Sequence, residues 1–242
     1  MKKIILFLFI LFFTISCSRD SNLLSKTKEI SPEKKSLLAY GAILSSRNAM
    51  DFSGLGFYEK GVEVSKLYKA DTISLLKESW EVSDRKTAIE ALDWLVIDGH
   101  RKTWDSYLYN LQEGGTEKYD GYEKDKARYD KCVKMLKEKF NINDDILKKV
   151  DMGAWDYDRL VTVSRWCYIA GYITEEEAWN YCITAKKLAQ ASFSSWEEYY
   201  ASCVFGRSIA YEGDPDELLE AGQELLKKDN SIWKEIPFKS NN

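Results

Sequence analysis

Histidine and paired cysteines are scarce in this chain of 242 residues, and each scarcity excludes a class of site. His100 is the only histidine, which excludes an ordinary histidine-rich metal site. None of the five cysteines forms a Cys-x-x-Cys pair, which excludes a zinc ribbon or a thioredoxin-like motif. The chain also has no Gly-x-Ser-x-Gly elbow, no phosphate-binding glycine loop and no His-Glu-x-x-His motif. We therefore expect no metal and no cofactor.

The chain also lacks long runs that alternate between polar and apolar residues, and only three prolines interrupt it. Alternation with period two indicates strands, whereas apolar residues three or four positions apart indicate helices. The second spacing recurs through most of the sequence. We therefore expect an all-α fold: a single multi-helix domain of about seven to nine helices with short loops. Its predicted limits are residues 32–228, and a C-terminal tail of residues 229–242 is expected to follow.

The strongest helix signals lie between residues 155 and 196. A first helix is predicted to end at Gly171, because glycine readily adopts the left-handed conformation that closes a helix. Thr174 is predicted to begin the next helix, and Glu177 three positions later completes a capping box. Ser195 repeats this arrangement and is predicted to open a third helix.

Several blocks in and before this stretch resemble a known bacterial family. In chain order they are SWEVSDR, WLVIDGHR, WDYDR, RWCYIAGYITEEEAW, FSSWEEYY and FGR. These blocks are similar to the DUF1266 family, and the resemblance extends roughly from Tyr40 to Tyr211. It implies an all-helical domain. It supplies no catalytic residues, because no activity is assigned to that family.

The start of the chain has the pattern of a bacterial lipoprotein signal. A basic start, MKK, precedes an apolar run over residues 4–15, and Cys17 follows it closely. We expect residues 1–16 to be removed as a signal peptide and Cys17 to carry the lipid. Residues 17–31 would then form a polar tether. This interpretation places the domain in the bacterial cell envelope, outside the cytoplasm, with a membrane as its partner through Cys17.

Two other interpretations of the signal remain open, an uncleaved anchor and a soluble secreted protein. Thr14 and Ile15 stand where a typical lipobox has leucine and then a small residue. The apolar run is also too short to span a bilayer comfortably. The sequence does not indicate which membrane would hold the lipid.

The chain is mildly acidic, with 35 basic and 39 acidic residues and a net charge of −4. Removal of residues 1–16 takes away two lysines, so the mature charge is 33 − 39 = −6. A chain with this negative net charge lacks the excess of basic residues that is typical of nucleic-acid-binding proteins. We expect no nucleic-acid partner, and an unidentified protein or small molecule as the partner of the domain.

Four cysteines remain after Cys17: Cys132, Cys167, Cys182 and Cys203. In an exported protein they could form disulfides. They could equally be small core residues, which is the interpretation that we favour.

A set of polar residues within the apolar central helices is the sharpest candidate for a site. Its members are Asp156, Arg159, Arg165, Arg207 and His100. Asp156 and Arg159 lie one helical turn apart and can pair. Gly206 beside Arg207 predicts a close neighbour that leaves no room for a side chain. Arginines among aromatic rings suit a carboxylate or phosphate ligand, but they also suit internal Asp–Arg pairs that fix helix packing.

His100 allows two interpretations. It could act as a general base together with a carboxylate such as Asp98. Alternatively, the Gly-His-Arg step just past a helix end could cap the exposed carbonyls of that helix, which is the commoner arrangement.

The missing reaction motifs favour a binding or protein-interaction module without catalysis. The alternative is a hydrolase or transferase of unrecognised type, with a polar site around Asp156, Arg159 and Arg207. An open cleft among these three side chains would favour the enzyme. Side chains that pair with each other inside filled helix packing would favour the binding module.

Overall fold

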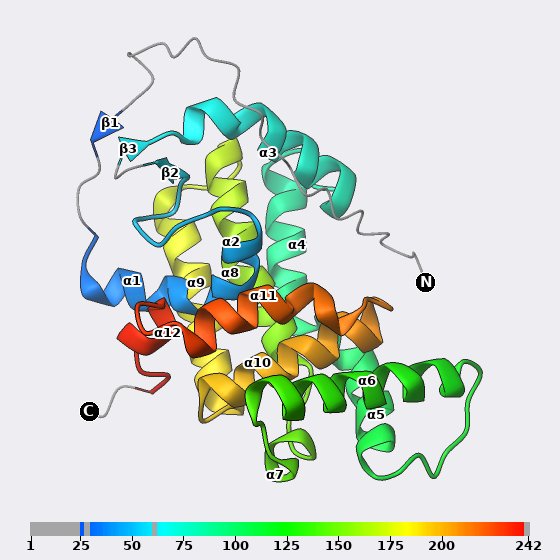
Figure 1. The fold of residues 1–242 in the computed structure, drawn as a ribbon. Helices are drawn as coiled ribbons and strands as arrows, with labels where there is room; N and C mark the ends of the chain where they lie inside the picture. Colours follow the sequence, from blue (N-terminus) through cyan, green and yellow to red (C-terminus); the bar gives the residue numbers. More distant parts are fainter. Residues whose placement is uncertain (1–24, 27–29, 60–61, 240–242) are drawn as a thin grey trace.

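The computed structural model describes residues 25–26, 30–59 and 62–239 (Figure 1). The predicted signal peptide, Cys17 and most of the predicted tether therefore lie outside the described residues. Within them the regular secondary structure is helical apart from one very small sheet, which confirms the all-α prediction.

Helices of seven residues or more form the frame of the fold. They are α1 (Pro32–Leu38), α3 (Ser65–Trp80), α4 (Arg85–Ile97), α5 (Arg101–Gln112), α6 (Tyr122–Phe140), α8 (Gly153–Ala170), α9 (Glu175–Ser192) and α10 (Trp196–Phe205). The shorter helices are η2 (Ala39–Gly41), α2 (Ala42–Arg47), α7 (Asp144–Leu147), η4 (Pro215–Leu218), α11 (Leu219–Gly222) and α12 (Ile232–Glu235). Two π-helical segments, η3 (Gly206–Ala210) and η5 (Gln223–Lys227), continue α10 and α11.

The sheet consists of three strands of two residues each, β1 (Ser25–Lys26), β2 (Tyr58–Glu59) and β3 (Val62–Glu63). Their order is β1-β3-β2, and both pairs are antiparallel. In Figure 1 the sheet lies at the edge of the molecule, next to the start of α3. Strands of two residues are too short to produce a recognisable alternation, which explains why the sequence contains no sign of this sheet.

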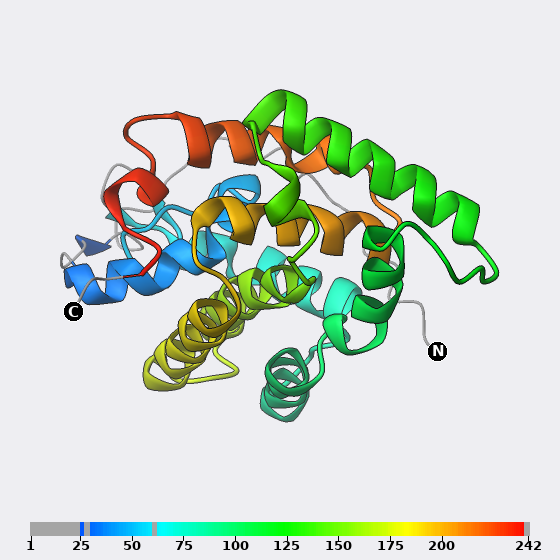
Figure 2. The same ribbon diagram turned by 90° about the horizontal axis from the view of Figure 1, so that it is seen from below.

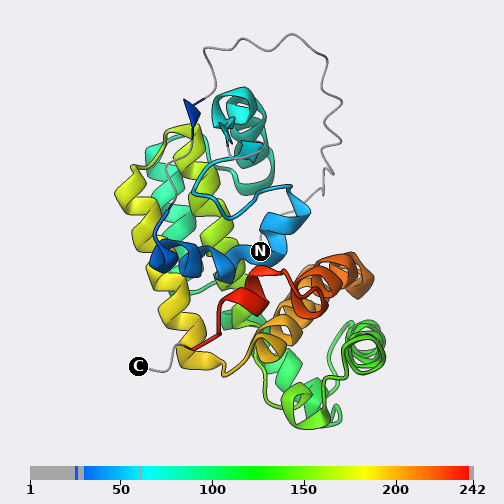
Figure 3. The same ribbon diagram turned by 60° about the vertical axis from the view of Figure 1, so that its left-hand side comes forward.

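Helix α8 is the centre of the fold and packs against α3, α4, α9 and α10. Figure 1 shows α4, α8 and α9 running alongside one another, while α6, α10 and α11 cross them near their lower ends. The views in Figures 2 and 3 show the same two groups of helices stacked on each other. All residues of α8 except Tyr168 are buried. A helix buried on every side must satisfy its charged side chains inside the protein.

The helix boundaries between α8 and α10 follow the predicted signals. Gly171 ends α8 in the left-handed conformation, with φ +84°. Thr174 and Glu177 form the predicted capping box at the start of α9. Ser195 begins α10, where its hydroxyl accepts the backbone N–H of Glu198. Local sequence therefore determines where these helices start and stop.

The prediction that residues 229–242 form a tail is wrong for residues up to Phe238, because this part of the chain packs into the core. The ring of Trp233 on α12 stacks on Trp196, with centroids 4.7 Å apart and planes 7° apart. Phe238 is buried, and its carbonyl accepts the hydroxyl of Tyr40. A helix of four residues offers no periodicity, so the sequence did not reveal this packing.

The four cysteines within the described part of the chain have free thiols, and all are buried. Burial raises the pKa of Cys132 and Cys167 to about 12, so both thiols stay protonated. They act as small core residues, and the disulfide alternative is not realised among them.

Candidate functional site

The carboxylate of Asp156 on α8 is fully buried and binds the start of α5. Its Oδ1 accepts the backbone N–H of His100 at 3.0 Å, and its Oδ2 accepts that of Arg101 at 3.0 Å. Both amides belong to the group of donors that a helix leaves unpaired at its start. The preceding Gly99 has φ +61°, and a Cβ on it would lie 2.1 Å from Oδ2. The close approach of Asp156 therefore requires glycine at this position.

The side chain of Arg101 joins this carboxylate to the end of α4. Its Nη1 donates to Asp156 Oδ2 at 3.1 Å and to the carbonyl of Leu95 at 2.8 Å. Its Nη2 donates to the carbonyl of Val96 at 2.5 Å. The Gly-His-Arg step thus does cap carbonyls of the preceding helix, but the arginine makes these bonds and the imidazole of His100 does not.

The guanidinium of Arg159 fills an aromatic cage beside Asp156. It pairs with Oδ1 of Asp156 through Nη2, donates to the carbonyl of Trp155 through Nε at 3.0 Å, and binds the hydroxyl of Tyr211 through Nη1. Its central carbon lies 5.0–6.0 Å from the ring centroids of Trp80, Trp94, Trp155 and Tyr211. Each nitrogen has a partner and the ring faces add cation–π attraction, so the cage is complete without a ligand.

His100 is a neutral member of this cluster. Its Nδ1 lies 3.1 Å from Nη2 of Arg159, and since arginine only donates, Nδ1 must accept and Nε2 must carry the proton. Burial, followed by the charge of Arg159, lowers the pKa of His100 to about 3. A group with that pKa is a weak base at neutral pH. Asp98, the expected carboxylate partner, instead pairs with Lys102.

Asp158 is a second buried carboxylate of α8, and sequence reasoning missed it. Its Oδ2 accepts the N–H of Ile43 at 2.9 Å and its Oδ1 that of Leu44 at 3.0 Å, at the start of α2. Burial raises the pKa of Asp158 to about 7. Asp156 and Asp158 therefore each hold the start of another helix. The signal available in the sequence was a second aspartate two positions after the first in an otherwise apolar helix.

Arg165 is also buried, but it lies apart from the cluster and holds the loop that follows α2. Its guanidinium donates to the carbonyls of Asp51, Leu55, Gly54 and Gly56 and to the hydroxyl of Ser45, at 2.7–3.2 Å. None of these acceptors is a carboxylate. Burial lowers the pKa of Arg165 to about 10. Four of these bonds tie the loop to α8, and the fifth binds Ser45 within α2.

Arg207 does not reach Asp156 and pairs with Glu217 instead. Its Nη2 lies 2.7 Å and its Nε 3.2 Å from Oε2 of Glu217. The close approach expected beside it exists, because a Cβ on Gly206 would lie 2.4 Å from Cβ of Trp155. The structure therefore brings His100, Asp156 and Arg159 together. It places Arg165 and Arg207 at two other positions.

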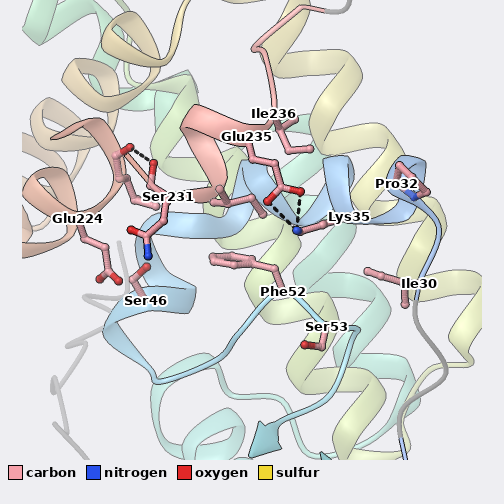
Figure 4. Close-up of a pocket in the computed structure, with 13 residues that line it drawn as sticks. Ile30, Pro32, Lys35, Ser46, Phe52, Ser53, Glu224, Ser231, Glu235 and Ile236 are labelled. Carbon is pink, nitrogen blue, oxygen red and sulfur yellow. Dashed lines mark hydrogen bonds and ion pairs between the residues drawn. The ribbon is translucent and has the colours of Figure 1, made fainter. Parts of the chain in front are cut away.

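A groove of about 930 Å³ lies between α1, the loop after α2, η5 and α12 (Figure 4). The side chains that line it are Ile30, Pro32, Lys35, Ser46, Phe52, Ser53, Glu224, Leu225, Asn230, Ser231, Ile232, Glu235 and Ile236. Figure 4 shows Glu224 and Ser46 at one end, Ile30 and Pro32 at the other, and Phe52 between them. No residue of the predicted polar cluster lines this groove.

An ion pair crosses the groove between α1 and α12. Nζ of Lys35 lies 2.6 Å and 2.7 Å from the two carboxylate oxygens of Glu235. Across the described ranges, no group of three or more histidine, cysteine, aspartate or glutamate side chains could hold a metal ion. Over the same ranges, no helix is long and apolar enough to cross a membrane.

These features define an all-helical protein whose central helix is held by internal carboxylate and arginine contacts. The chain belongs to the family described as "Protein of unknown function (DUF1266)", whose model matches residues 75–238. It is similar to "Uncharacterized protein YbeR" of Escherichia coli (strain K12), with 22% identity over 179 residues and 68% of each chain covered. No solved structure matches the chain.

Proposed function

We propose that this protein is an exported, lipid-anchored binding protein that holds its ligand in the groove without transforming it. The amino-terminal signal pattern and Cys17 support the envelope location. The observation that carries the binding proposal is the groove itself, which combines apolar side chains with two polar side chains, Ser46 and Asn230, that have no hydrogen-bond partner among the described residues.

The polar end of the groove has free hydrogen-bonding capacity. The hydroxyl of Ser46 and the amide of Asn230 make no side-chain hydrogen bond to another described residue. Glu224 lies near them, and Nζ of Lys228 is 3.9 Å from its Oε1. The wall beyond is apolar, with Phe52 among its members. An apolar wall with a few convergent polar groups is the usual composition of a small-molecule site, so the expected ligand is a small amphipathic molecule.

The rival function, a hydrolase or transferase at the Asp156 cluster, receives less support. The carboxylate of Asp156 binds two backbone amides and two arginines, and the guanidinium of Arg159 has a partner on every nitrogen. Arg207, the third residue of that hypothesis, pairs with Glu217 elsewhere. Groups that are satisfied by one another are not positioned to bind a substrate.

The binding proposal can be tested by NMR of the isotope-labelled domain against a panel of small amphipathic amines, carboxylates and alcohols. We expect backbone amide shifts to cluster at Ser46, Phe52 and Asn230 for at least one probe class. A Ser46→Trp variant should block these shifts by filling the groove. A matched Ser106→Trp variant, on the exposed surface of α5, should leave them unchanged. Shifts confined to His100 and its neighbours would contradict the proposal and support the enzyme.

A further inference from the structure

Two arginines from distant parts of the chain converge on one carboxylate away from the groove. Arg207 on η3 lies 2.7 Å from Oε2 of Glu217, and Arg47 at the end of α2 lies 3.7 Å from the same oxygen. The other oxygen of Glu217 accepts the backbone N–H of Asp214 at 3.2 Å. One negative charge therefore faces two positive charges.

Among the described residues, no carboxylate other than Glu217 forms an ion pair with Arg47 or Arg207. The nearest acidic residues along the chain have cations of their own: Glu212 pairs with Arg128 at 3.0 Å, and Asp214 pairs with Lys131 at 2.6 Å. Burial lowers the pKa of Arg47, and the charge of Arg207 lowers it further, while Glu217 acts in the opposite direction. Buried charges are normally paired within the protein, so a local excess of one positive charge is unusual.

The guanidinium of Arg47 is also short of hydrogen bonds. Its side chain is only 16% exposed, and Nη1 is buried without a hydrogen-bond partner among the described residues. Arginine carries five N–H donors in a planar fork, and the contact to Glu217 at 3.7 Å is too long for a hydrogen bond. Most of that donor capacity is therefore unused in the protein alone.

We propose that Arg47 and Arg207 form a binding site for the anionic oxygens of a small molecule, a phosphoryl or carboxylate group. The planar fork of a guanidinium matches both groups and binds them through parallel hydrogen bonds. Access is from the side of Glu217, whose side chain is 29% exposed. This site is separate from the groove, because neither arginine lines it. The result of testing this site is therefore independent of the result of testing the proposed function.

The test measures the melting temperature of the domain in sodium phosphate and in sodium acetate, each against sodium chloride at equal ionic strength. We expect the melting temperature to rise with the concentration of at least one of the two oxyanions and not with chloride, because only the folded protein offers the site. A response to phosphate alone identifies a phosphoryl site, and a response to acetate identifies a carboxylate site.

Two variants make the assignment specific to these residues. Arg47→Met keeps the apolar stem, and it should bind the responding anion at least tenfold more weakly while melting in chloride as the wild type does. Glu217→Gln removes the internal competitor and should bind the anion several-fold more tightly. The matched control is Arg85→Met, on an exposed arginine paired with Glu177. The proposal would be overturned if phosphate, acetate and chloride changed the melting temperature of the wild type equally. It would also be overturned if Arg47→Met responded to the anion as the wild type does, or if this variant had a much lower melting temperature in chloride.

Discussion

Arg159 and Asp156 lie three positions apart on α8 and pair inside the protein, where neither side chain is more than 1% exposed. The same carboxylate binds the first amides of α5, and the same guanidinium binds Tyr211 after η3. The pair therefore connects three segments that are distant in the chain. Asp156 is the counter-charge of the buried Arg159 guanidinium, so loss of Asp156 leaves that guanidinium unpaired, which is far more costly than loss of an exposed ion pair.

We expect His100 to remain neutral throughout the ordinary pH range. Burial and the neighbouring Arg159 lower its pKa to about 3, against 6.5 for an exposed histidine. It is the only histidine, so its imidazole signals in NMR need no assignment by mutation. Between pH 8 and pH 5 they should stay at the positions of the neutral Nε2–H tautomer. A titration midpoint near 6.5 would contradict the contact with Arg159.

The low pKa of His100 also predicts how stability changes with pH. The unfolded chain binds a proton on His100 below a pH of about 6.5, whereas the folded protein binds it only near pH 3. The stability contributed by the neutral imidazole is therefore lost as the pH falls from 6.5 towards 3. A His100→Asn variant keeps an acceptor facing Arg159 but cannot take up the proton. Denaturant unfolding at pH 7 and pH 4.5 should show a smaller loss of stability for the variant than for the wild type.

Arg165 should be essential for the loop that follows α2. Arg165→Met removes five hydrogen bonds to buried or half-buried oxygens, and we expect it to lower the free energy of unfolding by on the order of 3 kcal/mol. Limited proteolysis should show new cleavage within residues 51–57. Arg85→Met, which changes an exposed arginine, should behave like the wild type. Resistance to protease equal to that of the wild type would show that Arg165 does not hold the loop.

Cys17 should determine where the protein is found in the cell. If this residue carries the lipid, Cys17→Ser should release the protein from the membrane fraction and abolish its labelling with radioactive fatty acid. Cys203→Ser, which changes a buried thiol of the domain, should leave labelling intact. Persistent labelling of the Cys17→Ser protein would show that the lipid is attached to another residue.

Local signals in the sequence were sufficient for the helix boundaries between α8 and α10. Gly171, Thr174 and Ser195 act on their own helices through backbone conformation and nearby hydrogen bonds, so a single sequence contains the necessary information. The packing of α12 could not be predicted in this way. Trp233 is buried because Trp196, far away in the sequence, offers a ring on which it stacks.

The candidate cluster was predictable only in part. The spacing of Asp156 and Arg159 on one helix indicated a pair, and both lie in the same cluster with His100. The partner of Arg207 could not be inferred, because Glu217 belongs to a separate short helix whose position depends on the fold. The groove could not be predicted from the sequence either, because its lining comes from five separate segments that show no shared pattern.

The most direct test of this account is a set of thermal and denaturant melts for Arg159→Ala, Asp156→Ala and the double variant, with the exposed Lys187→Ala as control. Asp156→Ala leaves the buried guanidinium of Arg159 without a counter-charge, and Arg159→Ala removes one of the two cations that pair with the buried carboxylate of Asp156, so each should lose stability, on the order of 3–5 kcal/mol for the uncompensated guanidinium. The double variant should lose clearly less than the sum, because the orphan charge is gone as well. If Arg159→Ala melts like Lys187→Ala or at a higher temperature, the pair is not structural and the cluster is instead a site for a ligand.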